Sequence, residues 1–133
     1  MNNMDRFHIT VGLIFSQLYD RFPYKNDLNL NCFIDILPLE KNEDCMPWND
    51  MFHATMNWLK TENYILIQSE SKNDEYSKIE LTIKGLFSLS TITDTNGTKT
   101  TGESLVEAKL ARNIEKLKQH GRSVILSSIR ASA

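Results

Sequence analysis

The sequence predicts a mostly helical α+β fold, and a change in its hydrophobic period carries that prediction. Apolar residues recur at steps of three and four along residues 5–22, 28–39 and 47–61, which is the period of an amphipathic helix. The pattern then becomes β-rich in residues 64–68 and alternates in residues 78–82, on either side of a polar run. We therefore expect three helices followed by a β-hairpin.

Each expected helix has a signal at one of its ends. Pro23 ends the first helix, because a proline disfavours α geometry in the residue before it. The short second helix stops before Pro38, and Asn29 or Asn31 is expected to cap it. Pro47 suits the first turn of the third helix. The expected buried stripe of the third helix is Trp48, Phe52, Thr55, Met56 and Leu59.

A further helix is expected directly after the hairpin. Thr82 can cap it, and we expect Ile83, Leu86 and Phe87 on its inner side over residues 83–91. Together these elements form a predicted domain at residues 1–93.

The rest of the chain divides into a linker and a tail. Residues 94–102 are rich in threonine, contain no hydrophobic residue and are predicted to be a linker. Residues 103–133 are predicted to form a helical tail, with Gly121 just after a helix end. The tail carries an apolar stripe, expected to dock on the body or to form a homodimer: Leu105, Val106, Leu110, Ile114 and Leu117.

Two short stretches resemble those of winged helix-turn-helix domains. Residues 58–65, Trp-Leu-Lys-Thr-Glu-Asn-Tyr-Ile, are similar to the segment that joins the third helix to the wing in many bacterial members. Residues 81–86, Leu-Thr-Ile-Lys-Gly-Leu, are similar to the segment after the second wing strand. Asn63 stands where those members usually have glycine, and asparagine tolerates left-handed backbone geometry. The resemblance covers residues 5–92 and implies a winged helix. It does not extend to the C-terminal amphipathic helical tail, which is predicted from its apolar spacing alone.

Composition predicts a cytosolic protein. The N-terminus lacks a cationic stretch followed by an apolar one, so we expect no secretory signal. The longest apolar run, residues 124–126, is far shorter than a membrane span. Cys32 and Cys45 are thirteen residues apart and are expected to be reduced thiols.

Charge is distributed unevenly along the chain. Residues 1–63 carry five Lys/Arg against nine Asp/Glu, and residues 64–102 carry four against five. Residues 103–133 carry six against three. The body is therefore acidic and the tail basic, and this contrast bears on the choice of partner.

The exposed face of the third helix and the wing is the predicted partner-binding surface. Asparagine can bond adenine in two places, which makes a DNA-reading transcriptional regulator the alternative function. DNA affinity, however, depends largely on cations that neutralise phosphates, and carboxylates surround the few lysines here. The charges narrowly favour a basic protein partner over double-stranded DNA, as for a bacterial adaptor, an immunity protein or a phage inhibitor. The predicted binding residues are Asn49, Asp50, His53, Asn57, Lys60, Lys72 and Lys78.

No pattern in the sequence predicts catalysis, a cofactor or a metal. His8, His53 and His120 fall in three separate helices without metal-ligand spacing. The five glycines are scattered, so no phosphate-binding loop is expected. The sequence therefore predicts a binding module that is not an enzyme.

Overall fold

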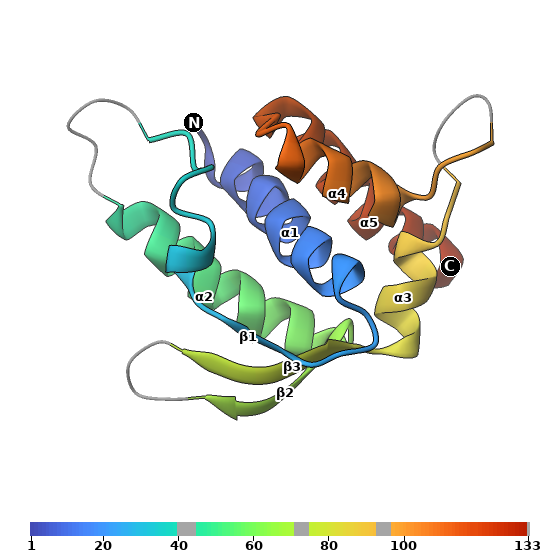
Figure 1. Ribbon diagram of the computed structural model, residues 1–133, viewed down its shortest axis with the longest axis horizontal. Helices are drawn as coiled ribbons and strands as arrows, with labels where there is room; N and C mark the ends of the chain where they lie inside the picture. The colour runs from blue at the N-terminus through green and yellow to red at the C-terminus, as the bar shows by residue number, and fades with distance from the viewer. Residues whose placement is uncertain (40–44, 71–74, 93–96, 133) are drawn as a thin grey trace.

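The computed structural model has α1 as a central helix, with α2 and a small sheet on one side and α4 and α5 on the other (Figure 1). It describes residues 1–39, 45–70, 75–92 and 97–132, with side chains as far as residue 127. The predicted α+β, mostly helical class is confirmed. The described elements are α1 (Asn3–Asp20), β1 (Asn26–Leu28), a 3-10 helix (Leu30–Cys32), α2 (Met46–Thr61), β2 (Ile65–Glu70), β3 (Tyr76–Leu81), α3 (Ile83–Leu89), α4 (Thr101–Leu110) and α5 (Ile114–Ser132).

Helix α1 is buried around its whole circumference in its central part. Every residue from His8 to Ser16 is buried, including Ile9 and Leu13, which lie opposite the predicted stripe. The prediction of a helix buried on one face was therefore too narrow. Phe22, the last apolar residue of the helix predicted over residues 5–22, lies beyond α1 and is exposed.

Two glycines allow α1 and α5 to cross at close range. A methyl group on Gly12 would lie 2.6 Å from the carbonyl oxygen of Leu117. A methyl group on Gly121 would collide with the carbonyl oxygen of His8. Gly121 was predicted to follow a helix end, but it lies inside α5. Glycine at this position therefore allows α5 to pack closely on α1 and does not end a helix.

The third predicted helix and the hairpin are confirmed. Helix α2 buries the predicted stripe, and β2 pairs with β3 in an antiparallel ladder that sets Ile65 opposite Leu81. Asn63, between α2 and β2, has a φ of 65°, the left-handed geometry that asparagine tolerates. The hydroxyl of Thr82 accepts a hydrogen bond from the N–H of Gly85 at 3.0 Å, so Thr82 caps α3 as predicted.

The helix predicted over residues 28–39 is wrong. Leu28 ends β1, which adds a third strand in the order β1-β3-β2, and Asn29 is extended with φ −146° and ψ 172°. A 3-10 helix and turns follow, and they still bury Phe33 and Leu37. The four-residue spacing of these two side chains mimicked a helix. The polar side chains between them offer the backbone alternatives to helix hydrogen bonds.

Of the three residues of α3 predicted to lie inside, only Leu86 packs against the core. Ile83 is 90% exposed and Phe87 is 69% exposed, although both were expected inside. The buried residues of α3 are Gly85, Ser88 and Leu89.

The predicted tail consists of two helices that pack on α1. Helix α4 begins at Thr101, inside the predicted linker, and Thr100 caps it. The chain turns at Arg112, which has a φ of 54°, and the side chain of Asn113 accepts a hydrogen bond from the N–H of Lys116 at the start of α5. Residues 94–96 of the predicted linker lie outside the described residues.

None of the described helices combines the length and the hydropathy that a membrane crossing needs.

The crossing of α1 and α5 predicts an unusual response to Gly121→Ala. In an open helix, alanine is more favourable than glycine by about 0.5–1 kcal/mol. Here the added methyl group has no room, so we expect the free energy of unfolding to fall by about 1–3 kcal/mol, as for other overpacked positions. Urea denaturation measures this change. The control is Gln119→Ala, at an exposed position of α5, which should leave stability within about 0.5 kcal/mol of the parent. Unchanged or increased stability of Gly121→Ala would contradict the close crossing.

Candidate functional site

The predicted binding residues of α2 lie on the side of the helix that leads to the hairpin. Asp50, Asn57 and Lys60 are exposed, whereas Asn49 and His53 are half-buried. Lys78 lies in β3, and Lys72 lies outside the described residues. We call this set, together with the outward side chains of β2 and β3, the α2–hairpin surface. The members belong to neighbouring elements, and their side chains differ in how free they are.

His53 is held by the hairpin. Its Nδ1 lies 2.6 Å from the hydroxyl oxygen of Tyr76, a hydrogen-bond distance, and the two rings are 5.5 Å apart between centroids. Phe52 contacts the same tyrosine edge-on at 5.8 Å. His53 therefore helps to fix the hairpin against α2.

Lys60 is also tied to the hairpin. Its Nζ lies 3.1 Å from a carboxylate oxygen of Glu70 at the end of β2, and both side chains are substantially exposed. Such a pair contributes little to stability, because solvent screens it. It nevertheless places the negative charge of Glu70 beside Lys60, a cation that would otherwise be available to a DNA phosphate.

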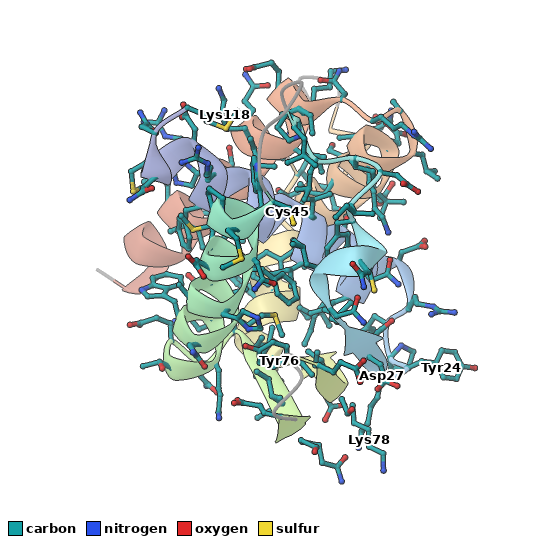
Figure 2. The ribbon with its side chains drawn as sticks, turned by 90° about the vertical axis from the view of Figure 1, so that its left-hand side faces the viewer. Tyr24, Asp27, Cys45, Tyr76, Lys78 and Lys118 are labelled. Carbon is teal, nitrogen blue, oxygen red and sulfur yellow. The ribbon has the colours of Figure 1, made fainter. Side chains whose placement is uncertain are left out.

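Lys78 lies at an irregularity between β1 and β3. Asn26 faces Ile79 and Leu28 faces Tyr76, so β3 has one residue more than β1 between the two pairs. Lys78 takes a φ of 54° there, and its N–H donates to the carboxylate of Asp27 at 3.0 Å. Figure 2 shows Asp27 and Lys78 together at one end of the molecule, with Lys118 of α5 at the opposite end.

The α2–hairpin surface carries more carboxylates than cations. Helix α2 and strands β2 and β3 contain two cations, Lys60 and Lys78, and three carboxylates, Asp50, Glu70 and Glu80. Asp27 adds a fourth carboxylate from β1. Negative charge therefore exceeds positive charge on these elements.

The apolar residues of the predicted tail stripe differ in how deeply they are buried. Leu105 and Leu117 are fully buried, and Ile114 packs at the edge of the core. Val106 is half-buried, while Leu110 is 80% exposed. Most of the stripe is therefore used to dock α4 and α5 on their own chain.

Two titratable groups of this packed region have shifted pKa values. Burial lowers the pKa of Lys109, whose ammonium group donates to the side-chain oxygen of Gln17. Burial also lowers the pKa of His120, and the nearby Lys116 lowers it further. Both shifts favour the neutral forms, as expected where a side chain leaves water.

Sequence reasoning missed the side chains that hold the predicted residues. Glu70 and Tyr76 border the polar run of the hairpin, and no local pattern pairs them with α2. Asp27 belongs to a strand that was not predicted. Glu70 stands just after the strand predicted over residues 64–68, which follows a helix with a lysine, and this placement could have indicated its ion pair with Lys60.

The contact between α2 and β3 predicts a loss of stability in Tyr76→Phe. This change removes only the hydroxyl that bonds to His53, so we expect the free energy of unfolding to fall by about 0.5–1.5 kcal/mol. Urea denaturation provides the measurement, and Tyr24→Phe is the control, because Tyr24 is 78% exposed. Equal stability of the two variants would show that the hydrogen bond contributes nothing.

Comparison of the chain with models of known protein families, with curated proteins and with solved structures finds no match.

Proposed function

We propose that the chain is a non-enzymatic winged-helix module that binds a basic protein partner through the α2–hairpin surface. The order of α1, α2, hairpin and α3 supports the winged-helix assignment, as does the pairing of β1 beside the hairpin. The sequence similarities at residues 58–65 and 81–86 coincide with the two ends of that hairpin. The second helix of the pattern is reduced here to a 3-10 turn.

The ion pair between Lys60 and Glu70 is the observation that favours a basic protein over DNA as the partner. A DNA-binding face needs cations that are free to replace the counterions of roughly six to ten phosphates. Lys60 already has a carboxylate at 3.1 Å, and a carboxylate is bound to the backbone of Lys78. A basic protein would meet Asp50 and Glu80 as well, so its approach is electrostatically favoured.

A cytosolic location belongs to the same proposal. Cys32 and Cys45 are free thiols, and free thiols are typical of reducing compartments.

Fluorescence anisotropy with two labelled probes tests the proposal. We expect an arginine-rich peptide to bind at about 50 mM salt and to dissociate as salt rises, whereas duplex DNA of arbitrary sequence should not bind. The variant Asp50→Asn/Glu80→Gln removes two carboxylates from the α2–hairpin surface. It should weaken peptide binding by roughly threefold to tenfold.

The matched control is Asp20→Asn/Glu115→Gln. It removes the same number of charges from α1 and α5, away from the hairpin. Equal weakening by both variants would mean that the peptide senses only the net charge. Salt-sensitive DNA binding that Lys60→Gln/Lys78→Gln abolishes would refute the proposal and support the DNA-reading regulator.

A further inference from the structure

A groove of about 1000 Å³ lies between α1 and α5, on a different side of α2 from the α2–hairpin surface. Helix α2 contributes only Trp58 to it. The groove lies where the first turns of α1 meet residues 115–126 of α5. Its volume is at the upper end of the range typical of small-molecule sites.

One wall of the groove is apolar and partly open to solvent. Phe7 contacts Trp58 edge-on at 5.4 Å, and Trp58 stacks on Tyr64 at 5.8 Å. Trp58 remains 36% exposed, and Leu126 remains 40% exposed. The aromatic contacts fix the orientation of the indole, so this wall is preformed.

The imidazole of His8 provides a polar group in the groove. His8 is only 9% exposed, and its ring makes no hydrogen bond to any of the described residues. Its ring nitrogens still reach solvent, so they are open to a hydrogen bond from outside the chain. A ligand in the groove would supply that bond.

Two cations, Lys118 and Arg122, and two carboxylates, Asp5 and Glu115, line the groove, and they act unequally on His8. Burial lowers the pKa of His8, and Arg122 is the next largest cause. Asp5 raises that pKa by less than Arg122 lowers it, and Lys118 lowers it further. Lys118 is paired with Glu115 at 3.2 Å, whereas Arg122 is exposed and has no ion pair within the described part of the chain.

We propose that this groove binds a small amphipathic carboxylate. The carboxylate group would accept hydrogen bonds from Arg122 and from the ring N–H of His8, and the apolar body would lie along Trp58 and Leu126. An arginine fork matches a carboxylate in geometry and in charge. A second copy of the chain fits less well, because two concave surfaces placed face to face would leave a void.

Titration of the ¹⁵N-labelled chain with decanoate, below its micelle-forming concentration, tests the proposal. The chain has two tryptophans, so two indole N–H signals report on Trp48, which is buried, and on Trp58, which lines the groove. Trp58→Phe assigns them. We expect decanoate to shift the Trp58 signal and to leave the Trp48 signal in place. Decanol and decyltrimethylammonium, which have the same chain length, should bind more weakly.

The variant Arg122→Gln tests whether Arg122 binds the carboxylate. Because Arg122 is exposed, its replacement should not affect folding, and we expect decanoate affinity to fall by roughly tenfold or more. Lys116→Gln is the matched control, since it removes an exposed cation from α5 outside the groove. No shift of the Trp58 signal, equal binding of the three ligands, or unchanged affinity in Arg122→Gln would each overturn the proposal.

A second readout follows the pKa of His8. A carboxylate beside the imidazole favours its charged form, so bound decanoate should raise the pKa of His8 from its lowered value. His120 also has a lowered pKa but lies outside the groove, and it should titrate as before. An equal change at both histidines would point to a general effect of the ligand and would also overturn the proposal.

Discussion

The crossing of α1 and α5 is the contact on which the rest of the architecture depends. Gly12 and Gly121 bring two backbones so close that neither position has room for a methyl group. This approach covers the side of α1 that faces away from α2, which is why α1 is buried all round between His8 and Ser16. It also places residues 115–126 of α5 beside the first turns of α1 and so creates the groove around His8. Both the core and the proposed ligand site therefore depend on glycine at positions 12 and 121.

On the other side of α1, polar contacts decide how α2 and the hairpin meet. The hydrogen bond of His53 to Tyr76 and the ion pair of Lys60 with Glu70 join the helix to the two strands at separate points. Two residues that were predicted to bind a partner, His53 and Lys60, thus help to position the hairpin. Their side chains are thereby committed within the chain, and the carboxylates that remain exposed dominate the surface. The same geometry that orders the α2–hairpin surface makes it acidic.

Sequence periodicity predicted the elements whose burial pattern is simple and local. Helix α2 has one buried stripe, and β2 and β3 form a hairpin, so their spacing was sufficient. Strand β1 was missed because three residues carry little periodicity, and Phe33 and Leu37 imitate a helix with turns between them. The second buried face of α1 was missed because its cover comes from residues about a hundred positions away. The polar face of α2 could be predicted from the sequence, whereas its contacts with Glu70 and Tyr76 and the contact of Asp27 with Lys78 could not, since each is a tertiary contact.

Helix α2 links the two proposed binding regions without mixing them. Successive residues of a helix point about 100° apart, so neighbours in sequence can serve different surfaces. Asn57 is exposed on the α2–hairpin surface, while the next residue, Trp58, turns toward α1 and lines the groove. The groove's cations lie on α5, and the carboxylates that would meet a basic partner lie on α2 and the hairpin. A basic partner and a small carboxylate therefore have separate contacts and opposite electrostatic requirements. One chain of this size can meet both because α1 separates the two charged regions.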